Sequence, residues 1–223
     1  MADQLYLSLW FPNFRFEALP AALVSVLRQF ALISGSGSPE GKRVTAASVY
    51  PISFTEAPTS QRIYVNDDRA QDSEASIIEN AVAEATEQLH DDMAYEFEMK
   101  WKLWTTESGA PGDPAAELDT LWKLQPSTVR FLGLGPRFDD AGYEQNGHIR
   151  IDFGLDTPWV MDDTIEDSEL DDLAQKRIQQ NVEMLLAFTL SVEKHCGISS
   201  RLLWTESGEP LAEKLIARLQ RLN

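Results

Sequence analysis

The stretch that decides the fold is MAYEFEMKWKL, residues 93–103, because its apolar and charged side chains alternate. The odd positions from Met93 to Leu103 are apolar or aromatic, whereas every even position after Ala94 carries Glu or Lys. A period of two is typical of a β-strand with one face on a hydrophobic core and the other face in solvent. The pattern therefore predicts an antiparallel-type sheet that is covered on one face only.

Before this strand the chain alternates strands with helices. Apolar alternation predicts a first strand over residues 5–10, and apolar residues at helical spacing predict helices over 18–32 and 73–90. Two further strands are expected between those helices, at 44–53 and 62–65. In order, these elements form a βαββαβ series, which is the arrangement of the ferredoxin-like motif.

After residue 103 the pattern predicts a similar series. The expected elements are a helix at 114–124, strands at 128–134 and 148–153, a long helix at 168–195, a strand at 201–204 and a closing helix at 211–222. The long helix is expected to stop at Gly197, just after Cys196. The second half of the chain is therefore interpreted as a repeat of the first.

A Leu-Trp pair marks this repeat. It occurs as Leu9-Trp10, Leu103-Trp104 and Leu203-Trp204, each time at the end of an expected strand and before a turn. We therefore predict an α+β fold of two tandem ferredoxin-like units, with largely antiparallel sheets covered by helices on one face, plus a C-terminal helix. The first unit is placed at 1–106 and the second at 107–223, although the two could form one compact domain. The alternative is a chance recurrence of common turn residues.

Charge limits the classes of partner. The 223-residue chain has 36 acidic and 19 basic residues and a formal net charge of −17. Such a field repels phosphate backbones and anionic lipid surfaces, so the sequence predicts no nucleic-acid partner and no membrane partner. The acidity either keeps the protein soluble or attracts a basic protein.

The sequence also suggests a compartment. Cys196 is the single cysteine and cannot form an internal disulfide, which fits a reducing environment. The N-terminus has no basic start of a secretory signal, and we expect no stretch to approach the ~18 to 20 apolar residues that cross a bilayer. We therefore expect a cytoplasmic protein.

Motifs for catalysis, cofactors and metals are each better explained structurally. The glycine-rich loop at 34–42 lacks the spacing of a phosphate-binding loop, and the neighbours His195 and Cys196 point about 100° apart on a helix. Glu107 and Glu206 recur in similar turns without a convergent partner. The three histidines show no zinc spacing, and the acidic segment after Asp156 lacks the pattern of a calcium loop. The sequence thus predicts no catalytic, cofactor or metal site.

A partner surface is the remaining candidate. Its expected residues come from the strand ends, one arginine and the acidic segment: Tyr6, Trp10, Trp104, Arg150, Asp162, Asp163 and Asp167. The leading interpretation is a non-catalytic acidic binding protein that inhibits or docks a basic protein, as an immunity-type protein would. The first alternative is a small-molecule binder or enzyme with a cleft between the two halves, lined by Trp and by arginines such as Arg130 or Arg150. The second is a structural subunit that buries its tryptophan face in an oligomer.

Overall fold

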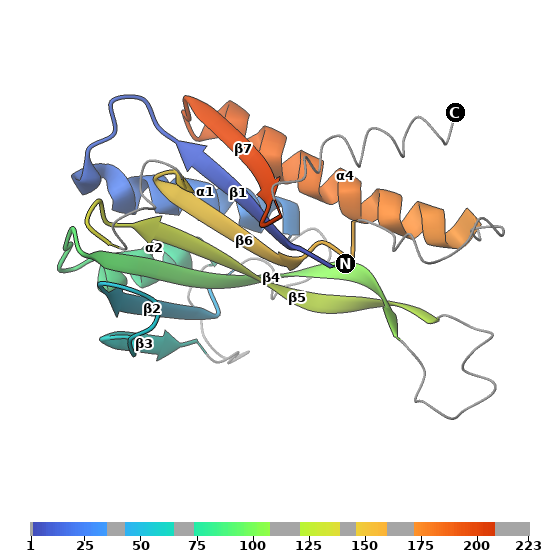
Figure 1. The fold of residues 1–223 in the computed structure, drawn as a ribbon, viewed down its shortest axis with the longest axis horizontal. Helices are drawn as coiled ribbons and strands as arrows, with labels where there is room; N and C mark the ends of the chain where they lie inside the picture. The colour runs from blue at the N-terminus through green and yellow to red at the C-terminus, as the bar shows by residue number, and fades with distance from the viewer. Residues whose placement is uncertain are drawn as a thin grey trace.

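One antiparallel sheet organises the protein. The computed structural model describes residues 2–34, 43–64, 74–107, 121–138, 146–159 and 172–207. Seven strands pair in the order β3-β2-β4-β5-β6-β1-β7 (Figure 1). Their bounds are β1 Gln4–Trp10, β2 Ala46–Pro51, β3 Ser60–Ile63, β4 Met93–Glu107, β5 Leu121–Leu134, β6 Ile149–Leu155 and β7 Ser200–Thr205.

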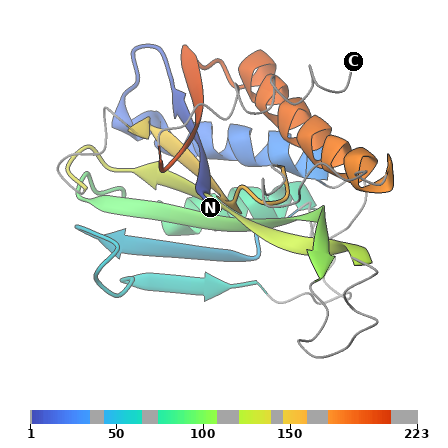
Figure 2. The same ribbon diagram turned by 45° about the vertical axis from the view of Figure 1, so that its right-hand side comes forward.

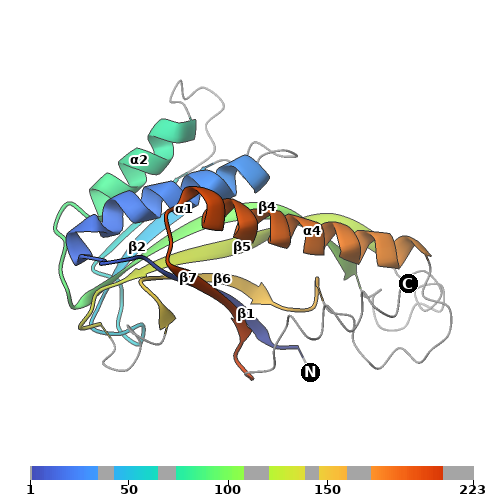
Figure 3. The same cartoon turned by 90° about the horizontal axis from the view of Figure 1, so that it is seen from above.

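The described helices cover one face of this sheet. They are α1 (Leu19–Ser34, after the short 3-10 turn Phe16–Ala18), α2 (Glu74–Ala85) and α4 (Asp172–His195). Seen from above, all three lie on the same side of the strands (Figure 3). The molecule is therefore a mixed α+β protein with a helical layer on a one-sided sheet, as the alternation in β4 predicts.

The hydrophobic core lies between the two layers. The helix-facing residues of β4, from Tyr95 to Leu103, are each at most 1% exposed. Phe30 of α1 lies at their centre, with its ring 5.3 Å from that of Trp101 and 5.1 Å from that of Phe131. Burying one such side chain stabilises the fold by roughly 1.5–3 kcal/mol, so this aromatic cluster anchors α1 to the sheet.

Strands from both halves of the chain share the sheet. β4 forms a long hairpin with β5, and β1 lies between β6 and β7 (Figure 2). The sheet is larger than two ferredoxin-like units, and the tandem ferredoxin-like duplication is not confirmed. What holds is the mixed α+β class with antiparallel strands.

The helix expected at 114–124 is wrong over its last four residues. β5 begins at Leu121, and its pairing with β4 extends to the Glu107–Leu121 pair. Cross-strand pairing with a 15-residue neighbour therefore overrides the local helical spacing. The rest of that expected helix, and the closing helix at 211–222, lie outside the described residues.

One expectation about apolar segments also needs correction. The combined helix Phe16–Ser34 has a mean hydropathy of 1.5, so its length and composition alone would let it cross a membrane. In this fold Leu23, Val26 and Leu27 on that helix are fully buried against the sheet. A buried core helix satisfies the same criterion, so the segment has a structural role here.

Candidate functional site

The helix-free face of the sheet is hollowed into a groove of about 670 Å³, here called the sheet groove. Six of the strands, β1 to β6, contribute to its lining. The lining residues that carry charge are Arg43, Glu96, Glu98, Lys100, Arg130, Arg150 and Asp152, and those with large apolar or aromatic side chains are Tyr6, Tyr50, Phe54, Ile63, Tyr64 and Leu132.

Strand alternation places these side chains in the groove. In β4, Glu96, Glu98 and Lys100 alternate with Phe97 and Met99, which are fully buried under the helices. The even-numbered residues of β4 therefore face away from the helical layer. The predicted wet face of this strand is thus the floor of the groove.

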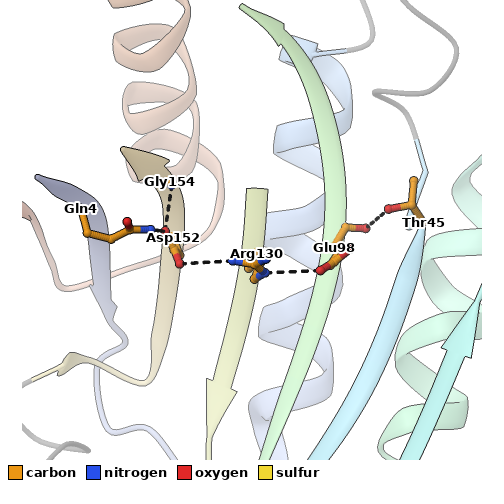
Figure 4. A network of polar contacts seen from close by, with 6 residues as sticks. All are labelled: Gln4, Thr45, Glu98, Arg130, Asp152 and Gly154. Carbon is orange, nitrogen blue, oxygen red and sulfur yellow. Dashed lines mark hydrogen bonds and ion pairs between the residues drawn. The ribbon is translucent and has the colours of Figure 1, made fainter. Parts of the chain in front are cut away.

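The register of the sheet aligns opposite charges across three strands. Glu98 pairs with Arg130, and Arg130 pairs with Asp152. The Arg130 Nε lies 3.3 Å from Glu98 Oε1, and its Nη1 lies 3.8 Å from Asp152 Oδ2 (Figure 4). We call this set the charged row. Side-chain exposures of 46%, 30% and 15% for Arg130, Glu98 and Asp152 leave it partly screened by solvent.

Asp152 is held by a β-bulge in β6. The register of β1 with β6 shifts between Gln4 and Tyr6, and Gly154 has a φ of 81° that L side chains rarely adopt. The Gly154 amide donates to Asp152 Oδ1 at 2.8 Å, and the Gln4 Nε2 donates to the same oxygen at 2.6 Å (Figure 4). One carboxylate oxygen of Asp152 is thus bound by the bulge and by β1, while the other faces Arg130.

An aromatic pair with an arginine borders the row. The Tyr6 and Trp204 rings lie 4.6 Å apart, and the Trp204 Nε1 donates to Ser8 Oγ at 2.9 Å. The Arg150 guanidinium lies 5.5 Å from the Tyr6 ring centroid, within the range of a cation–π contact. Its Nε is buried and has no hydrogen-bond partner among the described residues.

An apolar cluster lies beside the charged residues, and its members Leu132 and Tyr50 line the groove. Leu132, Leu134 and Phe138 are at most 4% exposed and form a small cluster with Ala94, against which Tyr50 packs. The Phe54 ring lies 5.2 Å from that of Tyr50 and 4.9 Å from that of Phe138. The sheet groove therefore combines a hydrophobic wall with a charged centre.

Burial and charge shift the pKa values in the groove. Burial raises the pKa of Glu96, although the positive charge of Arg130 partly opposes this shift. Burial lowers the pKa of Arg130, but its hydrogen bond to Glu98 and the charges of the nearby carboxylates outweigh this effect and raise the pKa. Burial, followed by the charge of Asp152, raises the pKa of Tyr6. Arg130 therefore stays cationic, and Glu96 carries a destabilised negative charge.

The structure brings together two of the residues expected at the partner surface. Tyr6 and Arg150 meet at the groove. Trp10 lies at the end of β1, where its carbonyl accepts from the Ser199 amide at 2.7 Å. Trp104 lies on the β4 extension, under the Arg177 guanidinium of α4 at 3.6 Å. Asp162, Asp163 and Asp167 lie outside the described residues.

Sequence reasoning named Arg130 and Arg150 as possible lining residues of a ligand cleft, and both line the groove, but it missed Asp152 and the hydrophobic wall. The outward alternation of β4 already identifies Glu96 and Glu98 as solvent-facing, but a single strand does not reveal its neighbours. Arg130 and Asp152 become partners only through the register of β5 with β6. Tyr50 lies in the short strand β2 and Phe54 follows it, and the pairing of that strand with β4 could not be predicted from its sequence.

The histidine and cysteine side chains show no convergent chemistry. Over the described ranges, no three His, Cys, Asp or Glu side chains are placed so that they could hold a metal ion. Cys196 accepts from Ser25 Oγ at 3.4 Å, and burial raises the pKa of its thiol. His148 stacks on Phe14 at 4.1 Å and accepts the Phe11 amide on Nδ1 at 3.0 Å.

Comparison with known proteins adds no identity. No protein-family model, no curated protein and no solved structure matches this chain. The functional conclusion therefore rests on the geometry of the sheet groove.

Proposed function

We propose that this protein is a non-catalytic binding protein that takes a small ligand in the sheet groove. The observation that carries the proposal is the hollow itself, whose volume of about 670 Å³ falls within the range of small-molecule sites. Such sites combine apolar walls with a few fixed polar groups, and the groove has both. This is the small-molecule alternative that the sequence left open.

The state of Glu98 and Asp152 favours binding over catalysis. Glu98 Oε1 and Asp152 Oδ2 face Arg130, and Asp152 Oδ1 accepts from Gln4 and Gly154. A general base needs a lone pair that faces the reacting proton, and these three oxygens face partners within the protein instead. Carboxylates fixed in this way are suited to orienting a ligand.

Docking of a basic protein at this face is less well supported. Arg43, Lys100, Arg130 and Arg150 line the groove against Glu96, Glu98 and Asp152, so the described lining carries four cations and three carboxylates. Although the chain has a net charge of −17, this lining has no excess of negative charge that would attract a cationic partner. A basic partner remains a proposal for the acidic remainder of the chain.

Two further expectations stay proposals. The tandem ferredoxin-like duplication is supported by the recurring Leu-Trp pairs, and strands from both proposed units line the groove. A cytoplasmic location is supported by the single cysteine.

The test blocks the groove without touching its charges. Ala46 lines the groove in β2, and an Ala46→Trp substitution would fill it with a large ring. Ala187 is exposed on α4, so Ala187→Trp is the matched control. The full-length protein and both variants would be screened by amide NMR against a library of small acids, amines and neutral compounds.

We expect at least one compound to shift amides of β1, β4, β5 and β6 in the wild type and in Ala187→Trp, but not in Ala46→Trp. Binding that persists in a folded Ala46→Trp variant, or shifts confined to the helical layer, would place the ligand elsewhere. The proposal would then be wrong. A library without a single groove-binding compound would also count against it.

A further inference from the structure

We infer that the ligand of the sheet groove is a small carboxylic acid with an elongated apolar body, whose carboxylate is bound by Arg150. This inference rests on the proposed function, because it names the chemistry of the ligand in that groove. Three features carry it: a guanidinium without an ion-pair partner, a hydrophobic wall that begins beside it, and the net charge of the lining.

Arg150 is uncompensated although a carboxylate lies two residues away on the same face of β6. Asp152 is already occupied, since Gln4 and Gly154 donate to its Oδ1 and Arg130 lies beside its Oδ2. Among the described residues, Arg150 makes no ion pair, and its buried Nε has no hydrogen-bond partner. A guanidinium without an acceptor or a counterion is unfavourable, and an incoming carboxylate would supply both.

The Tyr6 ring sets the orientation of this arginine. The guanidinium lies 5.5 Å from the ring centroid, and Tyr6 is itself packed against Trp204. A guanidinium whose face is covered by a ring still presents its N–H groups at its edge. These N–H groups match the two oxygens of a carboxylate, so Arg150 is preorganised for a bidentate contact.

The apolar wall begins beside Arg150 and runs diagonally across the strands. Leu132 of β5 pairs with Arg150 of β6, and the next residue of that row is Glu96 of β4. The other apolar residues lie in the neighbouring row, where Ala94 pairs with Leu134 on one side and with Tyr50 on the other. From β6 to β2 the sheet covers three strand spacings, which amount to about 14 Å. A ligand with its carboxylate at Arg150 would therefore lay an apolar body over Leu132 and diagonally past Glu96, toward Tyr50 and Phe54.

The charge of the lining favours one negative charge. Four cations against three carboxylates leave a net charge of +1 in the described part of the groove, which a single carboxylate neutralises. A phosphate with two charges would exceed this balance and would be repelled by Glu98 and Asp152. An amine would compete with Arg130 for those carboxylates and would leave Arg150 unpaired.

Three probes that share one alkyl tail distinguish anionic, neutral and cationic ligands. Octanoate, octanol and octylamine carry the same alkyl chain with a negative, a neutral and a positive head group. Each would be titrated into the full-length protein by amide NMR, and again into Arg150→Met, Arg150→Lys and Arg201→Met. Arg201 lies on β7 and pairs with Glu193, so Arg201→Met removes an arginine that is not among the groove residues.

We expect octanoate to bind at β5 and β6, and octanol and octylamine to bind at least tenfold more weakly. Arg150→Met should weaken octanoate binding about tenfold or more, because a hydrogen bond to a charged group is removed. Arg150→Lys keeps the positive charge but cannot make the bidentate contact, so its affinity for octanoate should lie between those of the wild type and Arg150→Met. Arg201→Met should bind octanoate like the wild type.

The inference is overturned if octanoate binds Arg150→Met as tightly as the wild type, if octylamine is the preferred probe, or if none of the three binds. Failure of the proposed function is distinguishable from these results. If another compound binds in the groove and is excluded by Ala46→Trp, the protein is still a groove binder and only the carboxylate assignment is wrong.

Discussion

Asn181 of α4 hydrogen-bonds both backbone groups of Trp104 in β4. Its Oδ1 accepts from the Trp104 amide at 3.0 Å, and its Nδ2 donates to the Trp104 carbonyl at 2.8 Å. β2 pairs with β4 only as far as Glu98, so beyond that residue the β4 edge has lost its neighbouring strand. A side-chain amide therefore takes the place of a strand at this edge, and it also donates to the Pro158 carbonyl at 2.9 Å.

Removing this amide should destabilise the fold. Asn181 is 1% exposed, and Asn181→Ala would leave the Trp104 amide and two carbonyl groups without their partner. We expect the free energy of unfolding to fall by about 3 kcal/mol, measured by chemical denaturation. Gln180→Ala changes an exposed neighbour on the same helix and should cost less than about 0.5 kcal/mol. Equal effects of the two substitutions would contradict the edge role of Asn181.

Two glycines should differ in how well they tolerate alanine. A Cβ on Gly135 would lie 2.3 Å from the Asp91 carbonyl oxygen, a backbone atom that must move. Gly154 has open space around it but a φ of 81°. We expect Gly135→Ala to cost about 3 kcal/mol through overpacking, and Gly154→Ala about 1–2 kcal/mol through backbone strain. Denaturation midpoints of the two variants would test which substitution costs more. A Gly154→Ala variant less stable than Gly135→Ala would contradict the prediction.

The charge of Glu96 should make stability fall as the pH rises. Burial raises the pKa of Glu96 in the folded protein above its ordinary value of 4.5, so the folded state binds the proton more tightly than the unfolded state. Stability from this group is full below pH 4.5 and declines as the pH rises through the folded pKa.

Glu96→Gln removes this ionisation and keeps the side-chain shape. The melting temperature of the variant should approach that of the wild type at pH 4.5 and exceed it increasingly toward neutral pH. Melting curves at several pH values test this expectation. A constant difference, or a less stable variant at neutral pH, is incompatible with it.

His148 should have the opposite dependence on pH. Burial lowers the pKa of its imidazole below 6.5, and the Phe11 amide donates to its Nδ1, which must be unprotonated to accept. Stability from the neutral ring is present above pH 6.5 and is lost as the pH falls through the lowered pKa. His148→Asn supplies an acceptor that does not titrate, so its melting temperature should decline less than that of the wild type on acidification. Parallel curves for the two proteins would refute this role.

The sequence determines the local elements better than their arrangement. Alternation in residues 93–103 correctly predicts β4 and a sheet with one covered face, because burial of one face requires an apolar side chain at every second residue. The start of β5 at Leu121 is not predictable in this way, since the pairing partner of that segment decides its conformation. The shared sheet depends on strand order, which the repeated Leu-Trp pairs do not encode.

The candidate site illustrates the same limit. Tyr6 and Arg150 could be chosen from the sequence, because each can be recognised from its own strand without knowledge of the other. The pairing of Glu98 with Arg130 and of Arg130 with Asp152 is a property of the register. Three charges that are scattered along the chain become one row only when the sheet forms.

The position of β1 between β6 and β7 has a consequence for synthesis on the ribosome. β1 is translated before the other six described strands, yet it pairs with β6 and β7, the last two of them. Its fully buried Leu5, Leu7 and Leu9 must therefore remain without these strand partners until residues 149–205 have been made. Nascent chains arrested before residue 149 should expose this apolar strand to chaperones, and the sheet should close only after β7 has left the exit tunnel.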